Sequence, residues 1–534
     1  MDLYAQMVAE RRLGIAEAER FRAVFAGRVP EIPEVLRALA TEYGLPYSDL
    51  TDAAPSAELL GGFPAKLLMK HELLPLRRVE DKIELAVGRL FDVGGIDALR
   101  AATGENFTLV VAPGQTILKI INQRLGVGAE TLDSLIIDER ISILEDESGG
   151  VDLENAAEDA SIIRFVNQIL VEAIRQRATD VHLEPGKDEL RIRYRIDGVL
   201  QEVPTPERLK KFQAAVISRV KIMSRLDIAE KRVPQDGRIK LHAGDGDVDV
   251  RVSVIPMIHG EGVVMRLLRQ QGALKGVNQL QMGDRDEAIL RRLLELPHGI
   301  ILVTGPTGSG KTTTLYASLQ EINDSTRKII TIEDPVEYQI KGLNQIPVSD
   351  KTGLTFARGL RSILRHDPDV VLVGEIRDRE TAEIAVQASL TGHLVFSTLH
   401  TNDSPSAITR LVDMGVEPYL VASSVEAILA QRLIRRICPK CGIAQPDGKR
   451  KLGKGCEACR ETGYHGRQAI FEMLEMTDPI RRMVLDSASS GEIREEARKR
   501  GWRSLSEDGH RLVDAGVTTW EEVMRVTKDS SETY

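Results

Sequence analysis

The pattern of apolar and polar positions changes period several times along the chain, and its clearest block lies in the second half. Between residues 285 and 435, short apolar runs alternate with stretches of helical spacing. Such runs, bounded by turn residues, are typical of strands buried on both faces. Strands that alternate with helices predict a parallel sheet with crossover helices. The expected strands are 300–303, 328–332, 370–373 and 394–398.

A second block, residues 158–275, predicts a separate α/β domain. Helices are expected at 161–177 and 207–226. Arg251 and Arg266 interrupt two of its strands. An arginine in such a place either pairs with a carboxylate or projects toward a phosphate, and both alternatives stay open here. The expected strands are 180–184, 189–196, 248–254 and 262–268.

Neither end of the chain carries an obvious catalytic motif. Residues 1–125 mix helical and strand periods and predict a small α/β interaction domain. Residues 126–157 predict a linker, because seven acidic residues cluster between 145 and 159. After residue 467 helical spacing predicts a helical C-terminal subdomain, 467–534. The N-terminal elements are expected as helices at 32–43, 92–101 and 115–125 and strands at 83–87 and 107–112.

The amino-acid composition limits the classes of function that this chain can have. Of 534 residues, 42% are hydrophobic and 28% charged, a balance typical of globular proteins. The formal net charge of -9 argues against nucleic-acid binding as the main role. No apolar run reaches about 18 residues, and the N-terminus lacks the apolar core of a secretory signal. We therefore expect a cytoplasmic protein that meets the membrane through partners.

A glycine-rich segment directly follows the first of the buried strands. It matches the pattern GxxxxGK[ST], whose backbone N–H groups cradle phosphate oxygens at the start of a helix. Lys311 is expected to reach the β- and γ-phosphates, and the Thr312 hydroxyl to bind Mg²⁺. The alternative is a strand–helix turn without a ligand. The predicted nucleotide-binding residues are Gly305, Pro306, Thr307, Gly308, Ser309, Gly310, Lys311, Thr312 and Thr313.

Acidic residues follow the next two strands. Glu333, Asp334 and Glu337 come after one strand, and Glu375 comes after the other. The carboxyl ends of strands face the ligand crevice in an open α/β sheet, so these acids can hold Mg²⁺ or orient the attacking water. We predict that Glu333 and Asp334 bind the nucleotide and its metal. Glu375 is the predicted water-activating residue, with Glu337 as a further catalytic candidate. Helix N-capping by Asp334 or Asp378 is the alternative.

Two histidines flank the fourth strand of the predicted sheet. His393 precedes this strand and His400 follows it. Imidazole donates or accepts hydrogen bonds near neutral pH, so the pair could sense the γ-phosphate or link it to a neighbouring group. A single histidine in this position would more often be structural. We predict that both histidines act at the phosphates.

All four cysteines lie within 22 residues of one another, as two CxxC pairs: Cys438 with Cys441, and Cys456 with Cys459. Two such pairs can supply four thiolates to one Zn²⁺ in tetrahedral geometry. Four thiolates leave no open position, so the predicted zinc site is structural. Iron–sulfur ligation and two unrelated thiol pairs are the alternatives.

Together these motifs make the chain resemble the ATPases of type II secretion and type IV pilus assembly, over about residues 150–534. The matching core motifs are the phosphate loop at 305–312, an acidic box at 331–337, the segment 374–378, a histidine box at 392–402 and the four cysteines. Segments 178–185, 195–198 and 231–238 resemble the domain that precedes the ATPase core in that family.

The resemblance implies a multi-domain α/β architecture. It places a RecA-like P-loop ATPase core at 285–435, after a small α/β (PAS-like) domain at 158–275. A tetracysteine zinc element at 436–466 and a helical C-terminal cap follow. Family members are cytoplasmic homo-hexamers that bind ATP and Mg²⁺ between two lobes, and Arg251 and Arg266 look like the arginines that reach the phosphates. Hydrolysis drives an inner-membrane platform protein that adds pilin subunits to a fibre.

Residues 1–125 resemble the family's N-terminal domain through Tyr43–Tyr47 and the strand–helix run that follows. In some relatives this domain binds cyclic di-GMP through tandem RLGxxL motifs. Here Arg12–Gly14 continues as Ile15–Glu17, and the next copy comes only at 124–126. The sequence therefore does not support a cyclic di-GMP site, and we expect docking to a membrane-anchored recruiting protein.

Two other function classes stay open at this point. The first is a nucleic-acid translocase built on the same core, which the zinc element and the basic loop 449–454 support. The negative net charge argues against it, and so does the lack of segments in which aromatic and basic residues alternate. A nucleotide-binding scaffold without hydrolysis is the other.

Overall fold

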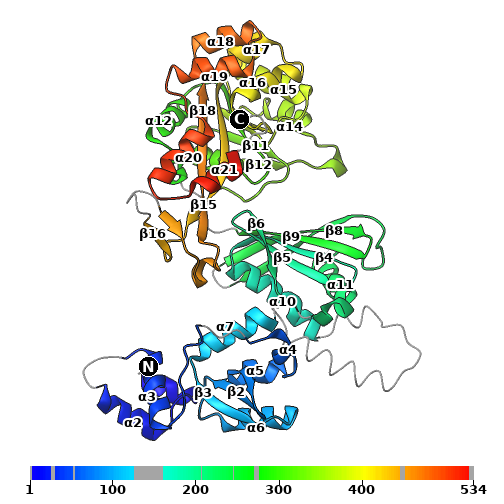
Figure 1. Ribbon diagram of the computed structural model, residues 1–534. Coiled ribbons are helices and arrows are strands. Elements are labelled where there is room, and N and C mark those ends of the chain that lie inside the picture. Colours follow the sequence, from blue (N-terminus) through cyan, green and yellow to red (C-terminus); the bar gives the residue numbers. More distant parts are fainter. Residues whose placement is uncertain are drawn as a thin grey trace. The chain divides into compact units, whose positions relative to one another are not determined.

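The structure is a computed structural model that describes residues 3–25, 30–51, 55–125, 160–205, 207–243, 246–269, 276–444 and 451–527. The chain divides into two compact units, residues 1–269 and 270–534 (Figure 1). The predicted linker, 126–157, lies outside the described residues. Among those residues, no helix is both long and apolar enough to cross a bilayer.

The N-terminal part of the first unit is a small α/β domain. Its sheet has the order β1-β2-β3, with β1 (Leu73–Val79) antiparallel and β3 (Phe107–Val111) parallel to β2 (Lys82–Val87). The expected helices and strands are present. Strand β1 was not predicted, because Pro75 and a register shift interrupt its alternation. The helices are α1 (Leu3–Ala9), α2 (Ile15–Val24), α3 (Ile32–Glu42), α4 (Ala57–Gly61), α5 (Ala65–His71), α6 (Val93–Thr103) and α7 (Gly114–Leu125).

Residues 160–269 form an antiparallel sheet of order β6-β5-β4-β9-β8-β7. Two helices pack on its apolar face, against side chains such as Val252 and Met265. They are α10 (Ala160–Arg175) and α11 (Gln213–Met223), and α11 follows the 3-10 helix η1 (Glu207–Phe212). Because side chains alternate along each strand, the other face is polar. The strands are β4 (Ala178–Pro185), β5 (Leu190–Ile196), β6 (Val199–Val203), β7 (Gln235–Ala243), β8 (Gly246–Met257) and β9 (Gly260–Arg269).

The second unit is built on a sheet of order β12-β11-β13-β14-β10-β15-β18. All neighbouring pairs are parallel except β15 with β18. Strand β10 is buried on both faces, since Ile300 and Leu302 belong to one core and Ile301 and Val303 to another. The strands are β10 (Gly299–Thr304), β11 (Ile329–Glu333), β12 (Asn344–Pro347), β13 (Val370–Val373), β14 (Leu394–Leu399), β15 (Val425–Ile437) and β18 (Tyr464–Glu475). The predicted parallel sheet is confirmed.

Helices lie on both sides of this sheet in Figure 1. They are α12 (Asp284–Leu294), α13 (Lys311–Glu321), α14 (Phe356–Ile363), α15 (Arg379–Leu390), α16 (Pro405–Asp413) and α17 (Pro418–Ser424). Short 3-10 helices occur at Val277–Leu280 (η2) and Asp350–Thr352 (η3). The C-terminal helices are α18 (Asp478–Leu485), α19 (Ser490–Arg498), α20 (Leu505–Asp514) and α21 (Trp520–Thr527), within the segment expected to be helical.

Strand β18 corrects the expectation that the chain becomes helical after residue 467. Residues 469–474 are buried, and a short apolar run buried on both faces has no period that separates strand from helix. The strand pairs antiparallel with β15 over most of its length. The seven-stranded sheet therefore extends beyond residue 435, and the cysteine element is inserted between its last two strands.

Candidate functional site

The glycine-rich loop connects the end of β10 to the start of α13. Gly305, Gly308 and Gly310 have φ values of +146°, +80° and +92°, in the region that favours glycine. A Cβ on Gly305 would lie 2.5 Å from the Gln431 carbonyl oxygen. Pro306, Thr307 and Gly308 are exposed, and Ser309 is buried. The loop is thus open to solvent and leads directly into the N-terminus of α13. Its backbone N–H groups and this helix N-terminus form the predicted anion-binding site.

Lys311 is the first residue of α13 and folds back over this loop. Its Nζ donates to the carbonyl oxygens of Gly305, at 2.7 Å, and Pro306, at 3.1 Å. Burial lowers the pKa of Lys311 to about 8, although nearby Glu375 favours the charged form. Thr312 is half-buried and Thr313 exposed in the same helical turn. The lysine is therefore held within the cradle, where a phosphate would meet it.

Gln431 of β15 supports the loop and was not found from the sequence. It is 2% exposed, and its Oε1 accepts a 2.7 Å hydrogen bond from the Thr314 hydroxyl of α13. A Cβ on Gly310 would lie 2.7 Å from Gln431 Nε2. The parallel pairing of β10 with β15 brings Gln431 to the loop, and no local pattern could have indicated that pairing.

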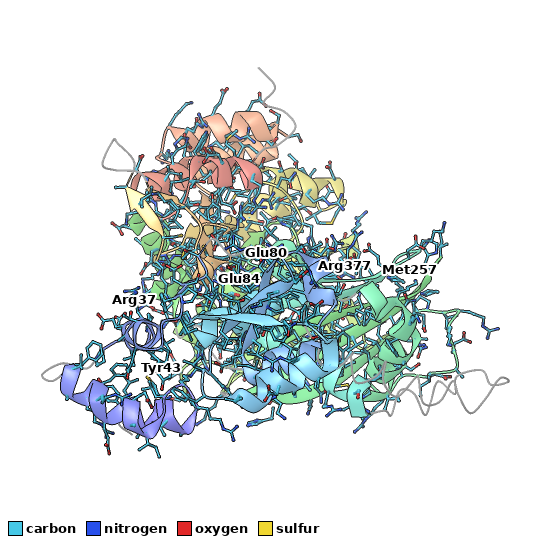
Figure 2. The ribbon with its side chains drawn as sticks, turned by 60° about the horizontal axis from the view of Figure 1, so that its bottom comes forward. Arg37, Tyr43, Glu80, Glu84, Met257 and Arg377 are labelled. Atoms are coloured by element: carbon cyan, nitrogen blue, oxygen red, sulfur yellow. The ribbon has the colours of Figure 1, made fainter. Side chains whose placement is uncertain are left out.

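Glu375 follows β13 and lies at the same edge of the sheet as the loop. One carboxylate oxygen forms an ion pair with Arg377 Nη2, at 2.5 Å, and the other lies 3.3 Å from His400 Nε2. Arg377, labelled in Figure 2, is 64% exposed in its side chain, whereas Glu375 is 12% exposed. The residue after Glu375 is fixed to β14, because the Ile376 N–H donates to the Thr398 carbonyl. A largely buried carboxylate is thus positioned beside the phosphate loop.

The two predicted histidines lie at opposite ends of β14. The register of β14 with β10 pairs Leu394 with Gly299 and Leu399 with Thr304, so His400 is at the phosphate edge and His393 at the far edge. His393 Nδ1 is 2.8 Å from the carbonyl oxygen of Ala388 at the end of α15. The prediction for His393 is therefore corrected: six residues of extended strand, about 20 Å, separate it from the phosphate loop of its own subunit.

The residues after His400 are fixed directly to the strand that carries the phosphate loop. The hydroxyls of Thr304 and Thr401 are 2.8 Å apart, and the Thr401 N–H donates to the Thr304 hydroxyl at 2.9 Å. Asn402 Oδ1 accepts a 3.0 Å hydrogen bond from Arg432. His400 is thereby placed relative to the loop by the sheet itself.

The acidic box divides into a buried and an exposed part. Glu333, 4% exposed, accepts hydrogen bonds from the hydroxyls of Tyr316 and Thr331 and from Gln345 Nε2. Burial and this carboxylate raise the pKa of Tyr316. Asp334 is exposed, and Glu337 is half-buried. The Glu333 side chain is thus enclosed in a hydrogen-bonded network behind the loop, and Asp334 is the accessible acid of the box.

Arg251 and Arg266 lie in the other unit. They are directly opposite each other on β8 and β9. Arg266 Nε donates to Asp180 Oδ1 at 3.1 Å, yet half of the Arg266 side chain stays exposed. The structure therefore brings Glu375 and His400 to the phosphate loop within one unit, and places both arginines side by side on the polar face of the six-stranded sheet.

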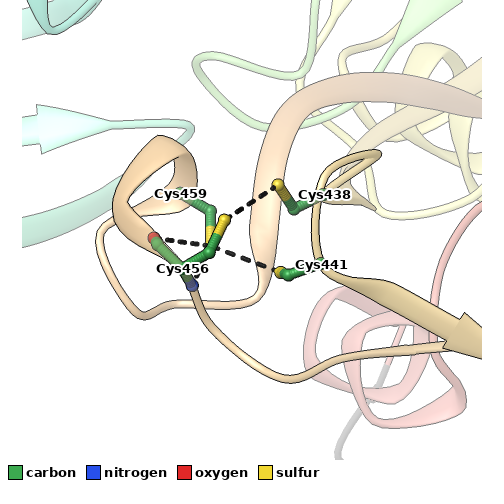
Figure 3. Close-up of side chains that lie close together, drawn as sticks. All are labelled: Cys438, Cys441, Cys456 and Cys459. Atoms are coloured by element: carbon green, nitrogen blue, oxygen red, sulfur yellow. Dashed lines mark hydrogen bonds between the residues drawn. The ribbon is translucent and has the colours of Figure 1, made fainter. Parts of the chain in front are cut away.

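The four cysteines converge as predicted (Figure 3). The Sγ distances are 3.8 Å for Cys438–Cys456 and 3.7 Å for Cys441–Cys459 and for Cys456–Cys459. All four sulfurs lie within 4.8 Å of one another. Four thiolates about 2.3 Å from a central Zn²⁺ are about 3.8 Å apart in a tetrahedron. The spacing fits a tetrahedral metal centre and is far too long for a disulfide.

This cluster sits at the end of the long β15–β18 hairpin. The Cys438 N–H donates to the Gly463 carbonyl at 2.9 Å, next to the last β15–β18 pair. The flanking strands β16 (Gly442–Ala444) and β17 (Lys451–Gly453) form a small sheet of their own, and the 3-10 helix η4 is Glu457–Cys459. The element is therefore joined to the seven-stranded sheet through β15 and β18.

Glu472 of β18 ties the segment after His400 to the C-terminal helices. It is 2% exposed, and one carboxylate oxygen accepts from both the N–H and the hydroxyl of Ser404 at 2.7 Å. The other oxygen accepts from the Leu505 N–H at 3.2 Å, and Trp502 Nε1 donates to the Ser404 hydroxyl at 3.4 Å. Burial raises the pKa of Glu472 to about 7, although the Ser404 donors favour ionisation.

This raised pKa predicts a pH-dependent stability. Below pH 4.5, Glu472 is protonated in both the folded and the unfolded chain, and its contribution is fully present. As the pH rises to about 7, the unfolded carboxyl ionises first, so folding loses about 3 kcal/mol relative to a Glu472→Gln variant. Thermal unfolding of both proteins between pH 4 and 8 tests this. A difference in melting temperature that stays constant with pH would contradict it, and Glu475→Gln on the same strand is the control.

Comparison with known proteins connects both units to one family. Residues 155–525 match the family described as type II/IV secretion system protein, and residues 43–131 match the MshEN domain. The type II secretion system protein HxcR of Pseudomonas aeruginosa is 52% identical over 388 residues, which are 73% of this chain and 82% of that protein. The type IV pilus assembly ATPase PilB of Myxococcus xanthus is 41% identical over 512 residues, 91% of this chain and 89% of PilB.

A solved structure supports the fold. The ATPase DotB of Legionella pneumophila superimposes with a TM-score of 0.52 at 21% identity, covering 68% of this chain and 95% of DotB. At this identity the likeness concerns the fold alone. The RecA-like architecture predicted from the sequence is thereby confirmed.

Proposed function

The chain belongs to the type II/IV secretion system protein family and is an ATPase, and on that premise we propose that it is a hexameric motor for pilus or pseudopilus assembly. The observation that carries this proposal is the grouping of Lys311, Glu375 and His400 at one edge of one sheet. A nucleotide-binding scaffold would need the phosphate loop alone. A buried carboxylate oriented by a histidine beside that loop supports hydrolysis.

The proposed chemistry assigns a role to each group. Backbone N–H groups of the loop and Lys311 bind the β- and γ-phosphates. The Thr312 hydroxyl would hold Mg²⁺, which would neutralise phosphate charge. Glu375 accepts a proton from a water molecule whose oxygen attacks the γ-phosphorus, and the bond to the β–γ bridging oxygen breaks to release ADP. His400 holds the Glu375 carboxylate in position. Asp334 and Glu337 line the approach to the metal.

Arg251 and Arg266 are proposed to supply positive charge to the same phosphates from the first unit. A planar guanidinium binds phosphate oxygens in a bidentate manner. The two arginines belong to the first unit and the phosphate loop to the second.

The cysteine element is proposed to bind one structural Zn²⁺ through Cys438, Cys441, Cys456 and Cys459. We predict about one zinc per purified chain by elemental analysis, and loss of that zinc in Cys441→Ser. Structural zinc contributes folding free energy, so chelation should expose residues 436–466 to trypsin while the sheet cores stay folded. Less than about 0.5 zinc per chain, with metal loss during purification excluded, would contradict the proposal.

The remaining parts of the proposal concern location and partners. We propose a cytoplasmic protein that is peripheral at the inner membrane, with residues 1–125 docking on a membrane-anchored recruiting protein and the ATPase ring acting on a platform protein. The MshEN match does not by itself assign a cyclic di-GMP site. Arg12 of the first RLG motif is 8% exposed in its side chain and forms an ion pair with Glu72 at 2.9 Å.

Stimulation of the ATPase rate separates this proposal from a nucleic-acid translocase. The purified chain is assayed with liposomes that carry an inner-membrane platform protein of a pilus or type II secretion system, with empty liposomes and with single- or double-stranded DNA. We expect the platform protein to give the largest increase in the rate. A larger increase with DNA would favour the translocase and contradict the assembly motor.

A further inference from the structure

The segment that carries His400 belongs to neither a helix nor a strand. It comprises residues 400–404, between the end of β14 at Leu399 and the start of α16 at Pro405. No ladder of backbone hydrogen bonds fixes such a segment, so its conformation depends on the partners of its individual residues. The position of His400 beside Glu375 therefore depends on what holds residues 401–404.

Residues 401–404 are each held by a residue from another element of the same unit. The partners come from β10, β15, α19 and β18. The contacts are Thr401 with Thr304, at 2.9 Å, Asn402 with Arg432, at 3.0 Å, Asp403 with Arg494, at 2.9 Å, and Ser404 with Glu472, at 2.7 Å. The Arg494 side chain is 41% exposed, and exposed ion pairs contribute little. Ser404 and Glu472, in contrast, are 0% and 2% exposed, so their contact is the restraint that can fix the end of the segment.

Glu472 is a buried carboxylate whose contacts are all hydrogen-bond donors. One oxygen accepts from the N–H and the hydroxyl of Ser404, and the other accepts from the Leu505 N–H at the start of α20. Among the residues that the structure describes, Glu472 forms no ion pair with a cationic side chain. A buried carboxylate without a cation costs folding free energy. A residue that breaks this rule is expected where function requires it, which here is the hold on Ser404.

We infer that Glu472 is a positioning residue for ATP hydrolysis, which acts through Ser404 on His400. This inference rests on the proposed ATPase function, in which His400 holds the Glu375 carboxylate. Glu472 fixes one end of residues 401–404, and Thr401 fixes the other end to the strand that leads into the phosphate loop. His400 Nε2 is thereby kept 3.3 Å from Glu375. The contacts of Glu472 are with Ser404 and Leu505, so its effect on the reaction is indirect.

The test is steady-state phosphate release by the full-length chain over a range of ATP concentrations. We expect Ser404→Ala to lower kcat about tenfold and to keep the KM for ATP within about twofold, because it frees the His400 segment and leaves the phosphate loop intact. Glu472→Gln should act in the same direction, because an amide cannot accept from both Ser404 and Leu505. Ser423→Ala is the matched control, since it removes an exposed hydroxyl of α17 in the same unit. Its kcat should equal that of the wild type.

A double-mutant cycle with His400→Ala separates positioning from a merely structural role. If Ser404 acts through His400, adding Ser404→Ala to His400→Ala should change kcat by less than about twofold. A general loss of stability would instead lower kcat by the same factor in both backgrounds. Melting temperatures of all variants establish that the proteins compared are folded.

The outcomes separate this inference from the function on which it rests. Wild-type kcat in folded Ser404→Ala and Glu472→Gln proteins would overturn the role of Glu472 and leave the ATPase proposal intact. An equal loss from Ser404→Ala with and without His400, or an unchanged kcat in His400→Ala, would also overturn it. A wild-type chain that releases no phosphate would overturn both.

Discussion

Replacing Lys311 with alanine should weaken ATP binding by about 100-fold or more and reduce hydrolysis to background. The Lys311 ammonium lies inside the phosphate cradle, 2.7 Å and 3.1 Å from two loop carbonyl oxygens. It is the charged side chain of the loop, and each charge-assisted hydrogen bond that it loses to phosphate costs about 1.5–3 kcal/mol. The measurements are an ATP titration and steady-state phosphate release.

Lys341→Ala is the control for Lys311→Ala, because Lys341 is an exposed lysine of the same unit. Removing Lys311 also removes a half-buried positive charge whose pKa is already lowered to about 8, so the fold should tolerate the change. Comparable melting temperatures for the two variants would establish this. Near-normal ATP affinity in a folded Lys311→Ala protein would contradict the assignment of this loop as the phosphate-binding site.

Replacing Glu375 with glutamine should keep ATP bound and lower the turnover rate by about 10²–10⁴-fold. The glutamine has nearly the same shape but cannot accept a proton from water, and general-base catalysis contributes that range of rate. The contacts changed at Arg377 and His400 involve partners whose side chains are 64% and 48% exposed. Since exposed pairs contribute little to stability, the variant should fold.

Glu380→Gln is the matched control for Glu375→Gln. Glu380 lies nearby in the chain, is 58% exposed and forms an ion pair with Arg361 at 2.7 Å, away from the phosphate loop in sequence. Its turnover rate should equal that of the wild type. Undiminished phosphate release from Glu375→Gln would show that another group activates the water, and Asp334 and Glu337 would then be the acids to test.

Local patterns predicted those parts of the site that are continuous in sequence. The loop from Gly305 to Thr313 combines a buried strand, glycines with positive φ and a helix start, so the sequence contained both its motif and its context. The two CxxC pairs predicted the cluster because each pair already sets the spacing of two thiolates. The position of Glu375 followed from the edge at which parallel strands end.

Features that depend on strand pairing could not be predicted in this way. Gln431 contacts the loop because β15 lies next to β10. Strand β18 was missed because a short apolar run that is buried on both faces has the same pattern in a strand as in a buried helix. His393 and His400 looked equivalent in sequence, but a parallel strand places its two ends at opposite edges of the sheet. The placement of Arg251 opposite Arg266 required the register of β8 with β9, because a shift of one residue would turn every side chain of a strand to the other face.

The central claim is that this site hydrolyses ATP with Glu375 as the water-activating group. The most direct measurement follows bound ATP and released phosphate in the same samples of wild type, Glu375→Gln and Glu380→Gln with Mg²⁺. We predict that wild type and Glu380→Gln turn ATP over, while Glu375→Gln retains ATP and releases almost no phosphate. Equal phosphate release from all three proteins, or no release from the wild type, would contradict the claim.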